Sequence, residues 1–156
     1  MSLNPLLAPI HSLLDYAAIQ PEHIESAIPS LIAQAREAVE AVATSTAAPS
    51  WQSIIEPLED ASERLWRAWS VAGHLNGVMN TPEIRNAYNA CLPAITAYST
   101  WVGLHKGLYA QYRRLKESPV FATLPAARQR IVDLALRDFR LSGVELEGEA
   151  RERYSQ

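Results

Sequence analysis

The sequence predicts an all-α fold, a bundle of about four main, partly kinked helices with short connections, within a single helical domain over residues 1–156. Three observations lead to this prediction. Apolar residues recur every three or four positions without any lasting strand-like alternation, and only six glycines occur in 156 residues. Hydrophobic residues make up 48% and charged residues 20% of the chain, which is typical of a globular protein with a buried core. Because the connections between the helices are short, we expect neighbouring helices to be antiparallel.

The first main helix is predicted to begin at Pro21 and to run to Val42. Proline suits the first turn because its missing N–H would have no partner there, and Glu22 favours the positive end of the helix dipole. Pro29 limits how far the first turn continues unbroken. The stripe expected to face the core consists of Ile28, Leu31, Ile32, Ala35, Val39 and Val42.

A linker over residues 44–49 precedes the second helix, for which Ser50 is the expected N-cap. Pro57 is expected to mark a kink or a restart. Two pairs of opposite charge with i,i+4 spacing should point outward: Asp60 with Arg64, and Glu63 with Arg67. The apolar face is predicted to contain Trp51, Ile54, Ile55, Leu58, Leu65, Trp69, Ala72 and Leu75.

One long helix is predicted for residues 81–112, with Thr81 as its cap, Pro82 in its first turn and Glu83 behind it. About 30 residues would extend roughly 45 Å at 1.5 Å per residue. Pro93 should bend this helix, because an interior proline removes one backbone hydrogen bond. The predicted stripe is Ile84, Tyr88, Cys91, Leu92, Ile95, Tyr98, Trp101 or Val102, His105, Leu108, Tyr109 and Tyr112.

The last complete helix is predicted to follow Pro125 and to stop at Gly143, where left-handed geometry costs little. Residues 147–156 are predicted to begin a further, truncated C-terminal helix. The side chains of the last complete helix expected to face inward are Ile131, Leu134, Ala135 and Phe139.

Charge and composition disfavour two classes of partner. The formal charge is −3 and the isoelectric point is near 5.8, so neither nucleic-acid phosphates nor anionic membranes should attract the chain. No window approaches the roughly 18 to 20 apolar residues that span a bilayer, and the N-terminus lacks the pattern of a signal peptide. Cys91 is the single cysteine, so no intrachain disulfide can form. We expect a cytoplasmic protein with Cys91 as a small core residue.

The sequence assigns no catalytic, cofactor-binding or metal-binding residue. Zinc hydrolases place two histidines one helical turn apart with a glutamate between them, whereas His11, His23, His74 and His105 are far apart in sequence. A site assembled from His74, His105 and a carboxylate remains an alternative. Cys91 lacks a partner motif for nucleophilic catalysis, no G-x-S-x-G occurs, and acidic pairs such as Glu59–Asp60 are typical of a solvated helix face.

Two further patterns concern packing or docking. Gly73 with Gly77, and Gly103 with Gly107, are spaced four apart, which predicts close helix crossings inside the bundle. Trp66 is three residues from Trp69, so this pair could cover a docking surface, although most aromatic residues are expected in the core.

Several segments together carry a family resemblance. Residues 81–112 read T-P-E-I-R-N-A-Y-N-A-C-L-P-A-I-T-A-Y-S-T-W-V-G-L-H-K-G-L-Y-A-Q-Y, residues 19–28 read I-Q-P-E-H-I-E-S-A-I, residues 74–78 read H-L-N-G-V, and residues 136–143 read L-R-D-F-R-L-S-G. In this order the series resembles the N-terminal region of the thimet-oligopeptidase family of zinc metallopeptidases. Ser26 replaces the second proline that is usual in the family's entry motif.

This resemblance implies a largely helical, soluble zinc endopeptidase that cuts short peptides inside a channel. The matched helices correspond to roughly the first quarter of such a protein. The family's H-E-x-x-H and its more distant glutamate ligand have no counterpart in this chain, so the resemblance implies zinc only in the full-length parent. It also implies that this portion is inactive alone, forms part of the channel wall and supports the zinc-bearing remainder of the peptidase.

Two alternatives stay open at this point. The chain could be a free-standing helical module that binds a protein or a peptide, or an unrelated helical enzyme that uses His74 and His105. If the chain is separated from the rest of a parent peptidase, an exposed apolar face should make it self-associate or swap its C-terminal helix.

Overall fold

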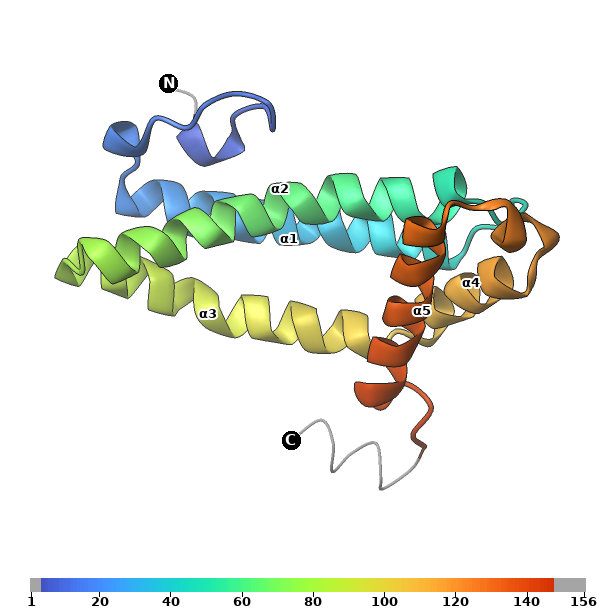
Figure 1. Cartoon of the computed structure of the whole chain (residues 1–156). Coiled ribbons are helices and arrows are strands. Elements are labelled where there is room, and N and C mark those ends of the chain that lie inside the picture. The colour runs from blue at the N-terminus through green and yellow to red at the C-terminus, as the bar shows by residue number, and fades with distance from the viewer. Residues whose placement is uncertain (1–3, 148–156) are drawn as a thin grey trace. The chain divides into compact units, whose positions relative to one another are not determined.

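Five α-helices and three short 3₁₀ helices form the regular structure of residues 4–147, the part of the chain that this computed structural model describes (Figure 1). This part contains no β-strand, which confirms the all-α prediction. Residues 148–156, which hold most of the predicted truncated helix, lie outside it. The α-helices are α1 (Pro21–Ala43), α2 (Trp51–Val78), α3 (Pro82–Gly103), α4 (Lys106–Glu117) and α5 (Ala126–Leu141), and the 3₁₀ helices are Pro5–Leu7, Tyr16–Ala18 and Pro119–Thr123.

The first three α-helices begin where the sequence predicts. α1 starts at Pro21. The Ser50 hydroxyl oxygen accepts the Ser53 N–H at 3.0 Å ahead of α2, and the Thr81 hydroxyl oxygen accepts the Ile84 N–H at 3.3 Å ahead of α3. These bonds satisfy N–H groups that have no partner within the first helical turn. The predictions for both N-caps are therefore confirmed.

The predicted stripe of α1 is confirmed in full, since all six residues from Ile28 to Val42 are buried. Most of the predicted face of α2 is also buried, while Leu58 and Trp69 are half-buried. Pro29 and Pro57 both lie inside continuous helices, so Pro57 does not mark a restart. Helical periodicity thus identifies the buried side of both helices.

The prediction of one helix over residues 81–112 is wrong. α3 ends at Gly103 and α4 begins at Lys106, with Pro93 inside α3 rather than at the break. The physical reason is His105, whose extended backbone (φ −79°, ψ 96°) and side-chain acceptor start a new helix. Leu92, predicted to be in the stripe, is 40% exposed.

The inward face of α5 also differs from the prediction. Ile131 is 44% exposed and Leu134 and Ala135 are half-buried, whereas Val132, Leu136 and the correctly predicted Phe139 are buried. These three residues follow i, i+4, i+7 spacing, which places them on one helix face and turns Ile131 away. The predicted stop is confirmed, because Gly143 follows α5 with a φ of 80°.

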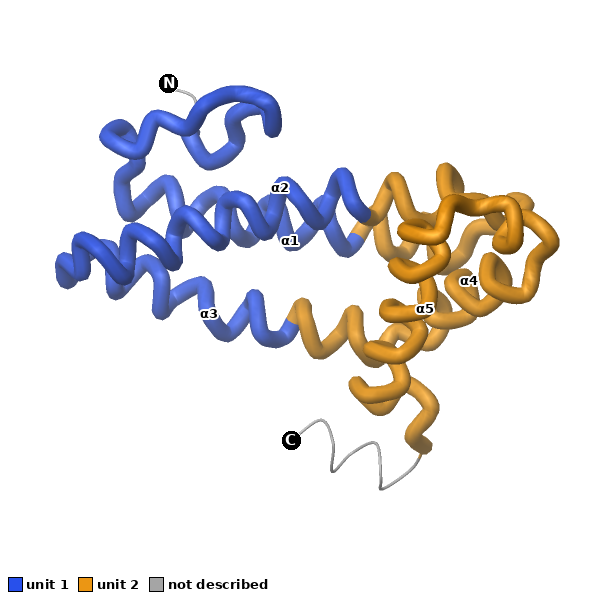
Figure 2. The backbone as a smooth tube through the Cα atoms, viewed as in Figure 1, with its two compact units in different colours: residues 1–36, 59–97 blue, residues 37–58, 98–156 orange. Residues whose placement is uncertain are grey.

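The chain divides into two compact units (Figure 2). Unit 1 comprises residues 1–36 and 59–97, and unit 2 comprises residues 37–58 and 98–156. α1, α2 and α3 each contribute residues to both units. That residues 1–156 form a single domain stays a prediction, which cooperative unfolding of the whole chain would test.

Each unit has an apolar core of its own. Unit 1 buries side chains from α1, α2 and α3, among them Ile24, Ile28, Leu31, Leu65, Ala72, Ile84, Cys91 and Ile95. The core of unit 2 contains Val39, Val42, Trp51, Ile54, Ile55, Leu108, Tyr109, Tyr112, Leu115, Val132, Leu136, Phe139 and Val144. Within residues 4–147, no helix is both long and apolar enough to span a membrane.

The glycine prediction is confirmed for one pair. A methyl group added to Gly103 would lie 3.0 Å from Cβ and Oγ of Ser142, and one added to Gly107 would lie 3.2 Å from the last residue of α1. Gly73 and Gly77 are different, since a methyl group there would have its nearest neighbour at 3.8 Å or nothing within 4 Å. Close backbone approach therefore requires glycine only in unit 2.

Candidate functional site

The two histidines of the alternative metal site have separate partners. His74 is exposed on α2, and its ring centroid lies 6.1 Å from that of Tyr16 in an edge-on arrangement. His105 accepts the Leu108 N–H and faces Glu40. In the described range 4–147, no group of three or more His, Cys, Asp or Glu side chains is placed to hold a metal ion.

Cys91 is a core residue of unit 1, as predicted. It is 5% exposed, and its Sγ lies 3.8 Å from the Ile24 carbonyl oxygen. Burial raises the pKa of the thiol above its ordinary value of 9.0, and the nearby Glu25 charge raises it further. Because the thiolate is the reactive form, this environment disfavours nucleophilic chemistry at neutral pH.

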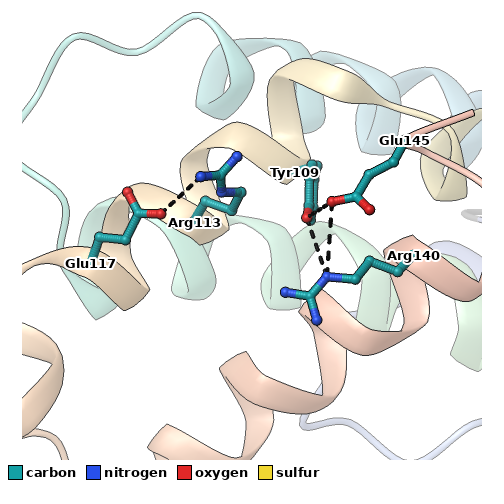
Figure 3. Close-up of polar contacts among 5 residues, drawn as sticks. All are labelled: Tyr109, Arg113, Glu117, Arg140 and Glu145. Atoms are coloured by element: carbon teal, nitrogen blue, oxygen red, sulfur yellow. Dashed lines mark hydrogen bonds and ion pairs between the residues drawn. The ribbon is translucent and has the colours of Figure 1, made fainter. Parts of the chain in front are cut away.

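A polar cluster in unit 2 connects α4, α5 and the segment that follows α5 (Figure 3). The Tyr109 hydroxyl donates a hydrogen bond to the Glu145 carboxylate, and Arg140 Nε donates to the Tyr109 oxygen at 3.3 Å. Arg140 also lies 3.9 Å from the Glu145 carboxylate. The hydrogen bond to Tyr109 raises the pKa of Arg140. The cluster places the positive Arg140 beside Glu145 and links the segment after α5 to α4.

The neighbouring pair on α4 in Figure 3 is a simple surface contact. Arg113 donates to the Glu117 carboxylate at 3.0 Å with i,i+4 spacing. That hydrogen bond, followed by charge attraction to Glu117, raises the pKa of Arg113. Both side chains are more than half exposed, which limits what such a pair adds to stability.

Gln111 and Arg114 of α4 hold the linker between α1 and α2. Gln111 Nε2 donates to the carbonyl oxygens of Ala43 and Ser45 at 3.2 and 2.9 Å, although the residue is only 5% exposed. Arg114 donates to the carbonyl oxygens of Ser45 and Ala47 at 3.2 and 3.1 Å, and to Gln111 Oε1 at 2.7 Å. We call this arrangement the linker clamp. Its two side chains satisfy backbone acceptors that the linker leaves without helical partners.

Sequence reasoning missed the linker clamp, although one signal was present. Gln111 lies between Leu108 and Tyr112, two residues of the predicted inward stripe, so a polar side chain at that position faces the interior. A buried amide needs hydrogen-bond partners, and the adjacent linker supplies them as carbonyl oxygens.

Unit 1 has an open hollow whose lining includes both apolar and acidic side chains. Its lining includes Tyr16, Val78 and Met79, which are 48%, 64% and 57% exposed. Glu22 and Glu83, from the first turns of α1 and α3, also line it. Unit 1 as a whole contains seven acidic and four basic residues, so it carries the net negative charge of the chain. The hollow is suited to a partner that is both apolar and basic.

Two expectations about the surface of α2 need correction. Trp69 does not pair with Trp66 on a docking surface, because it stacks on Tyr88 with a centroid distance of 4.4 Å and an interplanar angle of 11°. Trp66 is 38% exposed. Arg67, expected to pair with Glu63, instead donates hydrogen bonds to carbonyl oxygens at residues 9 and 12, which anchors the N-terminal segment.

Residues 28–151 match the family described as the Neurolysin/Thimet oligopeptidase N-terminal domain. Over 153 residues, or 98% of this chain, the sequence is 46% identical to oligopeptidase A of Salmonella typhimurium and 43% identical to oligopeptidase A of Escherichia coli. A probable cytosolic oligopeptidase A of Arabidopsis thaliana is 31% identical over 156 residues. In each case the chain spans 22% of the length of the curated relative.

Proposed function

The chain belongs to the Neurolysin/Thimet oligopeptidase N-terminal domain family, and from this membership we propose that it is the non-catalytic N-terminal portion of an oligopeptidase A-like zinc metallo-endopeptidase. The whole protein would cut short peptides, and this portion would form part of the channel wall and the scaffold for the zinc-bearing remainder. The observation that supports this most strongly is 43 to 46% identity to bacterial oligopeptidase A over 98% of the chain.

In this proposal, zinc binding and catalysis belong to the remainder of the full-length peptidase. A zinc hydrolase needs a pair of ligating histidines with a glutamate to activate water, and this sequence has no H-E-x-x-H. We propose no catalytic, cofactor-binding or metal-binding residue within residues 1–156. The remainder of the peptidase is the proposed partner, the cytoplasm is the proposed location, and neither nucleic acid nor a membrane is proposed as a partner.

Features of both units support a scaffolding role. Side-chain caps fix the starts of α2 and α3, the linker clamp fixes the connection between α1 and α2, and Arg67 anchors the N-terminal segment. Such contacts limit local motion, and a channel wall needs a fixed surface to hold substrates in one geometry.

A peptide-cleavage assay tests the assignment. The purified chain with added Zn²⁺ and a quenched short peptide should show no turnover. Zinc-dependent cleavage that disappears in His74→Ala would instead support the alternative of an enzyme built on His74 and His105. In the coding sequence, an in-frame continuation beyond Gln156 that reaches H-E-x-x-H would support the proposed parent and remove the free-standing alternative.

The acidic hollow favours a second candidate function, an interaction module for peptides or proteins. A lining that combines apolar side chains with Glu22 and Glu83 fits a segment that carries both hydrophobic and basic residues. The test is calorimetry with a short amphipathic peptide rich in Lys and Leu. Glu22→Gln combined with Glu83→Gln should weaken binding of the peptide. The control is Glu59→Gln combined with Glu63→Gln, which removes the same amount of charge elsewhere in unit 1. Equal loss in both double variants would contradict a specific site.

A further inference from the structure

α4 begins with an unusual cap, a histidine. His105 Nδ1 accepts the backbone N–H of Leu108 at 3.0 Å, and the His105 backbone is extended immediately before the helix. Only a ring nitrogen without a proton can accept a hydrogen bond, so this cap requires the neutral imidazole that carries its proton on Nε2. Ser, Thr, Asn and Asp are the usual caps, and their side-chain oxygens remain acceptors near neutral pH. Histidine differs because its ring can bind a second proton in that range and then has no acceptor.

The second ring nitrogen of His105 faces an acid. Nε2 lies 3.4 Å from Glu40 Oε1, while the Trp101 ring packs edge-on with its centroid 4.9 Å from that of His105. The neutral ring can therefore use both nitrogens at once, accepting from Leu108 and donating to Glu40. The His105 side chain is 14% exposed, so its ring is held in place between these partners.

We propose that His105 is a pH-dependent cap that controls the start of α4. When imidazole gains a second proton, Nδ1 changes from an acceptor to a donor, and the Leu108 N–H loses its partner. The new positive charge also lies at the helix N-terminus, where the helix dipole disfavours a cation. The imidazolium keeps its contact with Glu40, where the hydrogen bond from the neutral ring becomes an ion pair, so acidification removes the cap and strengthens the contact with Glu40.

The charged groups around His105 explain why the effect should be local. Glu40 faces the ring from α1 and attracts the imidazolium, which offsets part of the cost of losing the cap. Lys106 on α4 is next in sequence, and its ammonium lies 3.3 Å from Glu147. The last four residues of α3, from Thr100 to Gly103, bear no charge. The attraction of the imidazolium to Glu40 and the loss of the cap to Leu108 have opposite effects on stability. We therefore expect the first turn of α4 to loosen while global stability changes little.

The test is nuclear magnetic resonance of the full 156-residue chain between pH 8 and pH 5.5. At pH 8 the ring of His105 should show the tautomer with its proton on Nε2. Protection of the Leu108 amide against hydrogen exchange, corrected for the intrinsic pH dependence, should fall about tenfold at the acidic end, the factor that corresponds to one lost helix cap. Protection of Leu115 in the same helix should remain.

Matched variants separate the cap from a general acid effect. His105→Asn keeps a side-chain acceptor that does not titrate, so Leu108 protection should no longer depend on pH. His105→Ala should give low protection at both pH values, and His74→Asn should behave like the unchanged chain. A Leu108 response that is the same in the unchanged chain and in His105→Asn would overturn the proposal, as would a proton on Nδ1 at pH 8.

Discussion

The two units of the molecule use charge in different ways. Unit 2 contains ten acidic and ten basic residues, and its residues up to 147 form five ion pairs between Lys or Arg and a carboxylate, including Lys116 with Asp133 at 2.7 Å. Unit 1 contains seven acidic and four basic residues, and its Arg67 and Arg85 donate to backbone carbonyl or side-chain amide oxygens. Many charged side chains of unit 2 thus form ion pairs with one another, whereas unit 1 carries a net negative charge.

The difference extends to packing. Both units bury helix stripes, but unit 2 adds the linker clamp, the Tyr109–Glu145–Arg140 cluster and the close approaches at Gly103 and Gly107. Apolar burial supplies most of the stabilisation in either unit, whereas directional contacts specify which loops and helix ends meet. The comparison therefore predicts similar costs for core truncation and unequal costs for polar or glycine changes.

The largest expected effects are in the two cores. Leu65 in unit 1 and Leu115 in unit 2 are both 0% exposed. Leu65→Ala and Leu115→Ala should each lower the free energy of unfolding by about 2 to 5 kcal/mol, because each removes buried methyl groups and leaves a cavity. Urea unfolding measures this. A loss below about 1 kcal/mol for only one of them would show that its unit does not depend on its core as described.

The linker clamp should be the next most sensitive feature. Gln111→Ala leaves the Ala43 and Ser45 carbonyl oxygens without the Gln111 hydrogen bonds, and should cost about 1 to 3 kcal/mol in the same unfolding experiment. Gln34→Ala is the matched control, because Gln34 is exposed in unit 1 and should change stability by less than about 0.5 kcal/mol. Equal losses of unfolding free energy for the two substitutions would show that Gln111 stabilises the chain no more than an exposed glutamine does.

Replacing glycine with alanine should change stability in opposite directions in the two units. Gly103→Ala places a methyl group 3.0 Å from Ser142 in unit 2, and should destabilise the chain by about 1 to 3 kcal/mol. Gly77→Ala in unit 1 meets nothing within 4 Å inside a helix and should stabilise by about 0.5 to 1 kcal/mol. Thermal unfolding distinguishes these outcomes. A stabilising Gly103→Ala would contradict the close approach.

The smallest effect concerns Cys91 and alkaline pH. Its pKa is raised in the folded chain, so the unfolded chain loses the thiol proton first as pH rises. The stability due to this thiol is therefore present below its ordinary value of 9.0 and declines above it. Between pH 7 and pH 10, the unchanged chain should lose slightly more stability than Cys91→Ala. Parallel pH profiles would contradict the burial of this thiol, as would rapid alkylation of the folded chain at pH 7.

Separation of this portion from its proposed parent should also be visible in solution. Ile131 and Val120 in unit 2, and Met79 in unit 1, are exposed apolar side chains. We expect the isolated chain to self-associate at high concentration, which sedimentation measures. A strictly monomeric profile would contradict this expectation.

Periodicity and capping rules predict much of this fold, and particular residues show where they stop. The six-residue stripe of α1 and the caps Ser50 and Thr81 follow from spacing and from residue type. The break before α4 does not, because histidine is an uncommon cap and continued periodicity across His105 resembles one long helix. Ile131 and Val132 are adjacent apolar residues, so sequence alone does not decide which one faces inward.

The linker clamp and the Tyr109–Glu145 contact lie beyond sequence rules for another reason. They join residues that are 66 to 68 and 36 positions apart, and such contacts depend on how helices pack rather than on local pattern. The proposed absence of a catalytic site, in contrast, rests on the sequence itself, since H-E-x-x-H is a local pattern that the chain lacks.

The most direct test of the central claim replaces the matching 22% of Escherichia coli oligopeptidase A with this chain and measures zinc-dependent cleavage of a quenched short peptide. If the chain is the non-catalytic scaffold of such a peptidase, the chimera should cleave the peptide, and Leu115→Ala within it should lower its thermal stability. A chimera that unfolds cooperatively, binds zinc and yet fails to cleave would contradict the claim.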